Sequence, residues 1–91
     1  MLGLDWRPGA GRKLLSLIDY VSDRDEFAAE RLLQTIEHSI EIARQFPEAY
    51  RSGRVPNTRE IVAHPNYIVV YTVFADRIRV ISVLHARQKY P

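Results

Sequence analysis

Residues 67–74, YIVVYTVF, constrain the fold more than any other stretch of this sequence. The run consists of β-branched and aromatic residues, which favour a strand, and it is apolar at nearly every position. Side chains of a strand alternate between two faces. One face receives Tyr67, Val69, Tyr71 and Val73, and the other receives Ile68, Val70, Thr72 and Phe74. We therefore expect a strand in the middle of a sheet, buried on both faces.

The segments that flank this run are predicted to be its strand partners. Residues 59–64, REIVAH, alternate weakly between polar and apolar side chains, and Pro65-Asn66 predicts a turn. Residues 75–77, ADR, turn the chain again, and residues 78–86, IRVISVLHA, follow as a second β-branched strand. Residues 59–86 should therefore form a three-stranded antiparallel meander.

The first strand and the central loop are predicted from shorter signals. Residues 2–6, LGLDW, alternate as a short strand does, and Pro8-Gly9 is expected to end that strand. Residues 47–58, PEAYRSGRVPNT, contain two prolines and a glycine without any periodicity, so we expect a loop. This loop carries Arg51 and Arg54.

Two amphipathic helices are predicted between that strand and that loop. Apolar residues recur at helical spacing over residues 10–21 and again over residues 27–43. Asp23 or Asp25 can cap the second helix, and this helix should end before Pro47 because a proline disfavours helical geometry in the preceding residue. The short polar connection between the two helices predicts an antiparallel hairpin.

The predicted fold class is α+β. The elements follow in the order strand, helix, helix, strand, strand, strand, which is typical of helices packed on one face of a curved sheet. The opposite apolar face is then expected to form a shallow groove or to be covered by a partner. A chain of 91 residues is long enough for one domain, residues 1–91, and too short for two with separate cores.

Composition excludes several kinds of site. The chain has no cysteine, which excludes disulfides and zinc–thiolate sites. Its three histidines are scattered and it has no glycine-rich phosphate loop, so we expect no metal and no cofactor. No apolar run is long enough to span a membrane and no signal pattern precedes the first helix, so we expect a cytoplasmic protein without a membrane partner. The net charge is only +2, but residues 77–91 hold four basic residues and no acid.

The segment GRVPNTREIVAHPNYIVVYTVFADRIRVISVLHARQKYP, with the helix hairpin before it, resembles the RelE/ParE superfamily of toxins from bacterial type II toxin–antitoxin modules. The resemblance covers nearly the whole chain. It implies a toxin that arrests bacterial growth and is silenced in a hetero-oligomer by its antitoxin, whose helical and extended segments would cover the exposed apolar face. RelE-like members cut messenger RNA on the ribosome, whereas ParE-like members poison DNA gyrase. The fold does not distinguish these two activities.

The candidate site residues differ between the two activities. RNA cleavage without a metal needs groups that move protons and neutralise the phosphate, and the candidates for this are Arg59, His85, Arg87 and Tyr90. RNases that resemble RelE carry a basic residue just after the tyrosine that opens the central strand, where this chain has Ile68. The resemblance therefore favours the ParE type, with a target-binding patch of Arg51, Arg54, Arg87 and Lys89.

Simpler roles remain open for these residues. Arg87 and Lys89 can be solvated charges at the end of a strand, and His85 can hydrogen-bond the backbone. Arg54 and Arg59 can pair with Glu60. A binding module without toxic activity and a small nucleic-acid-binding protein are further alternatives, although residues 77–90 form only a thin basic stripe for the latter.

Overall fold

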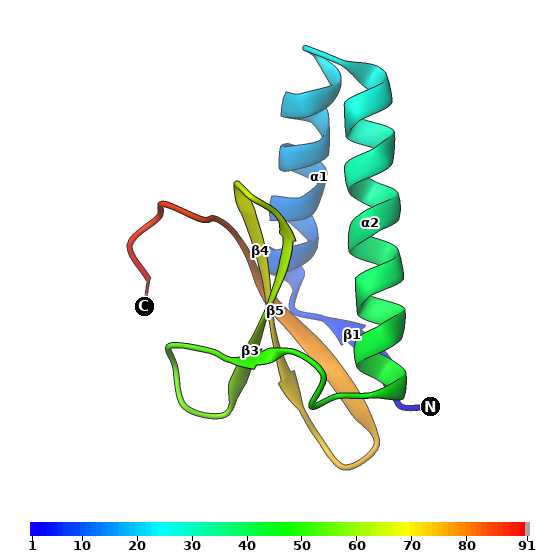
Figure 1. The fold of residues 1–91 in the computed structure, drawn as a ribbon, viewed down its shortest axis with the longest axis vertical. Helices are drawn as coiled ribbons and strands as arrows, with labels where there is room; N and C mark the ends of the chain where they lie inside the picture. The colour runs from blue at the N-terminus through cyan, green and yellow to red at the C-terminus, as the bar shows by residue number, and fades with distance from the viewer. Residues whose placement is uncertain (91) are drawn as a thin grey trace.

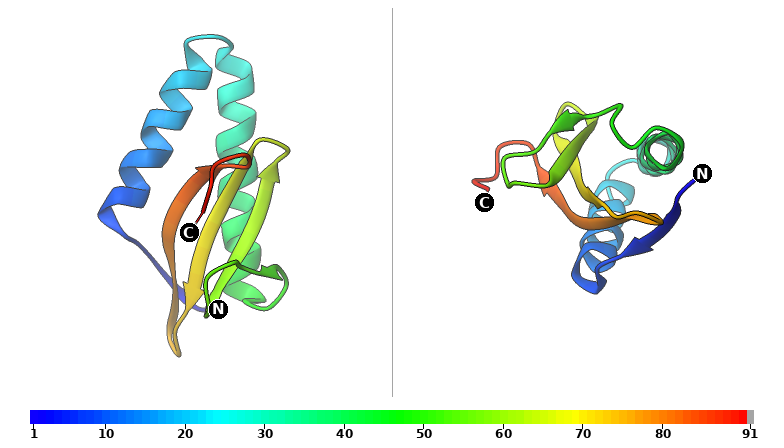
Figure 2. Two further views of the ribbon diagram at one scale, coloured as in Figure 1. Left: turned by 90° about the vertical axis from the view of Figure 1, so that its left-hand side faces the viewer. Right: turned by 90° about the horizontal axis from the view of Figure 1, so that it is seen from below.

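The computed structural model describes residues 1–90, which form two helices packed against a five-stranded sheet (Figure 1). The elements in chain order are β1 (Gly3–Trp6), α1 (Pro8–Ser22), α2 (Glu26–Gln45), β2 (Arg51–Ser52), β3 (Thr58–His64), β4 (Tyr67–Val73) and β5 (Arg77–His85). The strands lie in the order β1-β5-β4-β3-β2. The helix hairpin covers one side of the sheet, and we call the opposite side the outer face (Figure 2). The predicted α+β class and the order of its main elements are confirmed.

The meander of β3, β4 and β5 is antiparallel, with Ile61 paired with Val69 and Val69 paired with Val83. The strand β1 adds to the other edge of β5 in a parallel arrangement, which the sequence pattern did not indicate. The loop predicted over residues 47–58 also contains a short strand. In this strand, β2, Arg51 pairs with Glu60 of β3, so the prediction of a loop without strands was wrong at that point.

The helices begin and end close to the predicted positions. The first strand ends before Pro8, as expected, and the first helix begins at Pro8 rather than at residue 10, because the fixed φ of proline suits the first turn of a helix and its missing N–H costs nothing there. Asp25 caps α2, and its Oδ1 accepts a 3.0 Å hydrogen bond from the backbone N–H of Ala28. The helix α2 ends at Gln45, two residues before Pro47.

The main core lies between the helices and the sheet. It contains the buried residues Ala10, Leu32, Ile36, Ile40, Ala43, Ile61, Val69, Tyr71, Ile78 and Val80. Trp6 and Tyr67 pack against this core. The two sets of side chains on β4 separate as the alternation predicted, because Val69 and Tyr71 belong to this core whereas Ile68 and Val70 belong to a second cluster on the outer face.

The outer face is covered by the chain itself. Ile68, Val70 and Leu84 are buried there, and the residues packed against them include Ala86 and Tyr90. These two belong to the C-terminal segment, residues 86–90, which leaves β5 and turns back in front of the sheet (Figure 2). We expected this face to form a shallow groove or to be covered by a partner, and this expectation is wrong for the centre of the face.

Candidate target-binding surface

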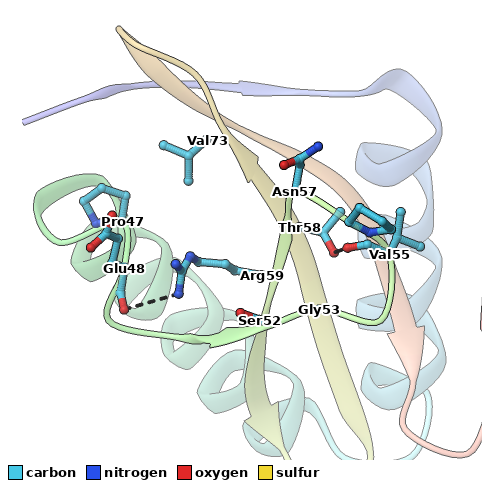
Figure 3. A pocket seen from close by; sticks show the side chains of 10 residues that line it. Pro47, Glu48, Ser52, Gly53, Val55, Asn57, Thr58, Arg59 and Val73 are labelled. Atoms are coloured by element: carbon cyan, nitrogen blue, oxygen red, sulfur yellow. Dashed lines mark hydrogen bonds between the residues drawn. The ribbon is translucent and has the colours of Figure 1, made fainter.

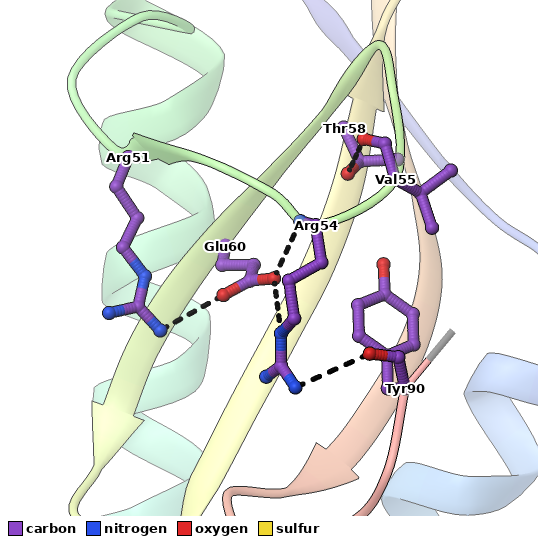
Figure 4. A network of polar contacts seen from close by, with 6 residues as sticks. All are labelled: Arg51, Arg54, Val55, Thr58, Glu60 and Tyr90. Atoms are coloured by element: carbon purple, nitrogen blue, oxygen red, sulfur yellow. Dashed lines mark hydrogen bonds and ion pairs between the residues drawn. The ribbon is translucent and has the colours of Figure 1, made fainter.

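A buried carboxylate organises the outer face beside β2. Glu60 lies on β3, opposite Val70 of the outer-face cluster, and only 3% of its surface is exposed. Its Oε1 accepts a 2.9 Å hydrogen bond from Nη2 of Arg51. Its Oε2 accepts hydrogen bonds from the backbone N–H and from Nε of Arg54, at 3.1 and 3.4 Å (Figure 4). One carboxylate thus holds both arginines of the loop.

Two opposing effects act on the pKa of Glu60. Burial works to raise it, because a carboxylate loses hydration in the protein interior. The backbone hydrogen bond from Arg54, the side-chain hydrogen bond from Arg51 and the charges of both arginines lower it. The arginines outweigh burial, so the pKa of Glu60 lies below its ordinary value and the group is ionised at neutral pH.

The C-terminal segment lies next to Arg54. Nη1 of Arg54 donates a 3.5 Å hydrogen bond to the backbone oxygen of Tyr90, and its guanidinium carbon lies 5.0 Å from the centroid of the Tyr90 ring (Figure 4). Arg87 and Lys89 are exposed on the same segment. The loop and the segment therefore meet at Arg54 and Tyr90. We call the four basic residues of these two pieces, Arg51, Arg54, Arg87 and Lys89, the basic surface.

His85, the last residue of β5, is fixed by its neighbours. Its Nδ1 accepts a 3.1 Å hydrogen bond from the backbone N–H of Arg87. Its ring packs edge-on against the ring of Tyr67 on β4, with the centroids 5.6 Å apart. Because Nδ1 is an acceptor in this arrangement, a neutral His85 carries its proton on Nε2. The side chain orders the start of the C-terminal segment.

Arg59 lies on the other side of the sheet from Tyr90. It pairs with Tyr71, and residues opposite each other in an antiparallel pair point to the same face, which here is the helix side. Nη1 of Arg59 donates hydrogen bonds to the backbone oxygens of Tyr50, at 2.7 Å, and Glu48, at 3.4 Å. Its guanidinium therefore stabilises the loop after α2. The structure does not bring Arg59 together with Tyr90.

A hollow of about 500 Å³ lies beside Arg59 (Figure 3). Its lining consists of Pro47, Glu48, Ser52, Gly53, Val55, Pro56, Asn57, Thr58, Arg59 and Val73. None of these residues is a histidine or a tyrosine that could move a proton. His85, Arg87 and Tyr90 do not line this hollow, so the four candidate catalytic residues share no pocket there.

Metal-ligand clusters are not found in the part of the chain that the structure describes, since no three of its histidine, aspartate and glutamate side chains gather to hold an ion. Neither helix among residues 1–90 is long and apolar enough to cross a membrane.

The residue that sequence reasoning underrated is Glu60. Its possible pairing with Arg54 was noted, but not its burial or its bond to Arg51. The usable signal was its place in the strand, because alternation puts Glu60 on the same face of β3 as Val62 and opposite Val70 of the buried strand. A charged side chain at a strand position that faces buried residues requires partners.

Comparison with known proteins identifies the group to which this chain belongs. The sequence model of the family described as "ParE toxin of type II toxin-antitoxin system, parDE" matches residues 4–90. The chain belongs to the ParE toxin family. A relative from Sinorhizobium fredii (strain NBRC 101917 / NGR234), named "Putative toxin Y4kP", is 32% identical over 87 residues. That match covers 94% of this chain and 90% of the relative.

Solved structures share the fold of this chain. A chain of the chromosomal ParDE system from P. aeruginosa has a TM-score of 0.78 at 19% identity, covering 93% of this chain and 96% of that one. The YoeB dimer from Staphylococcus aureus gives a TM-score of 0.65 at 14% identity, with 98% of each chain covered. HP0894 from Helicobacter pylori gives 0.64 at 18% identity, covering 99% of this chain and all of that one.

The ParE family assignment confirms that this protein is a RelE/ParE-superfamily toxin of a type II toxin–antitoxin system. A toxin of this kind has an antitoxin as its partner. At these low identities the solved structures show a shared fold, and the fold is common to ParE and YoeB.

Proposed function

We propose that this toxin arrests growth by binding DNA gyrase through the basic surface, as the resemblance to ParE-like toxins implies. The observation that carries the proposal is the separation of Arg59 from Tyr90, which lie on opposite sides of the sheet. Metal-free RNA cleavage needs proton-transfer groups and a cation around one phosphate. Side chains divided between two faces do not provide that arrangement, whereas docking requires only an exposed surface.

Two other residues support docking over cleavage. Nδ1 of His85 already accepts a hydrogen bond from the backbone of Arg87, which leaves only Nε2 for other partners. Ile68, which stands where RNases that resemble RelE carry a basic residue, is 3% exposed and lies in the outer-face cluster beneath Tyr90. A basic side chain at this position would have to be buried.

The basic surface is suited to an acidic partner surface. Its four cations are exposed, and the one buried carboxylate of Glu60 pairs with only two of them, Arg51 and Arg54, so the surface keeps a net positive charge. Exposed charges of one sign steer a partner of the opposite sign and raise the association rate. We therefore expect binding to gyrase to weaken as salt concentration rises.

The test uses the purified chain in two parallel assays, gyrase supercoiling of plasmid DNA and messenger RNA integrity in a translating extract. We expect loss of supercoiling with intact RNA. Replacing Arg87 and Lys89 together by alanine should weaken gyrase inhibition about tenfold, since each lost surface cation costs a fraction of a kcal/mol to ~1 kcal/mol. The matched control replaces Arg12 and Arg31, exposed cations of the two helices, and should inhibit as the wild type does. Cut RNA with normal supercoiling would favour ribosome-dependent cleavage instead.

The antitoxin is proposed to use two surfaces. An acidic segment would cover the basic surface and so mask it from gyrase. An amphipathic helix would enter a groove of about 440 Å³, since the centre of the outer face is covered by the C-terminal segment. This groove is lined by Leu4, Trp6, Leu14, Leu33, Glu37, Ile40 and Glu41 of β1, α1 and α2.

A further inference from the structure

Glu60 is the one charged side chain that is buried among residues 1–90. Removing a carboxylate from water is costly, and the cost is recovered only when the group is fully hydrogen-bonded or paired. An apolar residue at this position of β3 would avoid that cost, because Glu60 pairs with Val70 of β4, which belongs to the outer-face cluster together with Ile68. The burial of Glu60 therefore suggests a role beyond packing.

The contacts of Glu60 point outward, to side chains that reach solvent. The side chains of Arg51 and Arg54 are 58% and 41% exposed, while that of Glu60 is 2% exposed. The carboxylate thus lies beneath two guanidinium groups and holds each by one edge. Arginine side chains on a loop lose much rotational freedom when a partner binds them, and a fixed anion beneath them removes that freedom in advance.

Arg54 extends this arrangement to the C-terminal segment. It is held by Glu60 through its backbone N–H and its Nε, and it donates from Nη1 to the backbone oxygen of Tyr90. Tyr90 in turn packs over Ile68, Val70 and Leu84. A continuous line of contacts therefore joins the carboxylate to the segment that carries Arg87 and Lys89 (Figure 4).

We propose that Glu60 is a positioning residue for the basic surface. It fixes Arg51 and Arg54 in one orientation and, through Arg54, holds the C-terminal segment, so that the four cations meet their target as one preorganised unit. The inference rests on the proposed docking function and specifies how the conformation of the basic surface is maintained.

The direction in which Glu60→Gln changes the affinity for gyrase distinguishes this positioning role from a purely electrostatic one. Glu60→Gln keeps the size of the side chain but removes its negative charge, which makes the surface more basic. If the arginines acted only as charges, the variant would bind an acidic target more tightly. If Glu60 positions them, the variant should bind gyrase about tenfold more weakly, because the ordering cost of two arginines returns at binding.

A double-mutant cycle identifies the residues through which Glu60 acts. Glu60→Gln should weaken gyrase binding in the wild-type chain and change it less than about twofold when Arg51 and Arg54 are already alanine. Equal losses in both backgrounds would mean that Glu60 supports the fold only, and would overturn the proposal. Asp76→Asn is the control, since Asp76 forms a 2.8 Å ion pair with Arg77 in the turn between β4 and β5, and it should leave gyrase binding unchanged.

A second measurement does not depend on gyrase. Trypsin cuts after lysine and arginine, and the rate of cutting after Arg87 and Lys89 reports how firmly the C-terminal segment is held. We expect Glu60→Gln to raise this rate severalfold and Asp76→Asn to leave it unchanged. If alanine at Arg51 and Arg54 does not affect gyrase inhibition, the docking function fails, and the trypsin rate alone then decides whether Glu60 positions the segment. An unchanged rate in Glu60→Gln would reject the positioning role.

Discussion

The hydroxyl of Tyr71, at the centre of β4, donates a 2.7 Å hydrogen bond to the backbone oxygen of Pro47, just after α2. This bond ties the central strand to the loop that begins the meander, and Tyr71 is fully buried. Tyr71→Phe keeps the ring but leaves the Pro47 oxygen without this donor. We expect the free energy of unfolding to fall by about 1–2 kcal/mol, measured by urea denaturation at pH 7.

The same residue should make the fold sensitive to alkali. Burial raises the pKa of Tyr71 to about 12, against a smaller opposing effect of the Arg59 charge. In the unfolded chain a tyrosine loses its proton near pH 10, so the unfolded state binds fewer protons than the folded state above that pH. The stabilising contribution of the neutral phenol is therefore complete below about pH 10 and is lost as pH rises toward 12. Tyr71→Phe should show a shallower loss of stability over this range, and an identical slope would contradict the assignment.

Gly53, between β2 and β3, has no room for a side chain. A Cβ placed there would clash with Oγ1 of Thr58 and lie 3.1 Å from its Cβ. That hydroxyl donates a 2.7 Å hydrogen bond to the backbone oxygen of Val55, so it cannot move away freely. Gly53→Ala should therefore lower the free energy of unfolding by about 1–3 kcal/mol, as overpacking does elsewhere. Thermal unfolding followed by circular dichroism measures the change.

The matched control is Gly11→Ala in α1, where an added Cβ meets nothing within 4 Å. Alanine is the better helix former by about 1 kcal/mol, so this variant should be more stable than the wild type. Opposite signs for the two substitutions are the expected result. Two losses of similar size would show that the crowding at Gly53 does not determine its effect.

The sequence predicted the elements whose signals are local and strong. The two-sided apolar run of β4 and the helical spacing before Pro47 each have one simple solution, and both were found at the expected residues. Asp25 was one of two candidate caps, and only the structure selects it. The parallel pairing of β1 with β5 was not predictable, because it joins Gly3 to Arg77 across most of the chain.

The arrangement of the candidate site was less accessible to sequence reasoning. Whether Arg59 faces the helices or the outer side depends on the register of β3, and a one-residue shift reverses it. The cover that Tyr90 provides over the outer face depends on where the chain turns after His85, and no periodic signal marks that turn. The sequence therefore identified candidate residues of suitable chemistry, but it did not determine which face of the sheet each of them occupies.

Removing the hydroxyl group of Tyr90 should distinguish docking from RNA cleavage. Its hydroxyl is buried and has no hydrogen-bond partner among residues 1–90. A buried hydroxyl without a partner is costly, so Tyr90→Phe should leave stability unchanged or raise it by about 1 kcal/mol. Toxicity should also be unchanged, because the ring still covers Ile68 and Val70. Growth assays with induced expression, together with thermal unfolding, test both expectations.

The companion variant Tyr90→Ala should behave differently. It removes the ring that covers the outer-face cluster and the neighbour of Arg54, so both stability and gyrase inhibition should fall. Loss of toxicity in Tyr90→Phe with unchanged stability would show that the phenolic proton is needed. That result would support the RNase alternative.

Trp6 provides a direct probe of the groove proposed for the antitoxin. It is the only tryptophan of the chain and it lines this groove together with Leu33. Binding of an apolar helix there should shift the emission of Trp6 to shorter wavelength, because water is displaced from its ring.

Leu33→Glu would add an acid next to Glu37 on the groove wall and should weaken antitoxin binding at least about tenfold, through lost burial and a desolvated charge. The control is Leu15→Glu, since Leu15 is 67% exposed on α1 and does not line the groove. Tight binding by Leu33→Glu with an unshifted Trp6 spectrum would place the antitoxin helix elsewhere on the toxin.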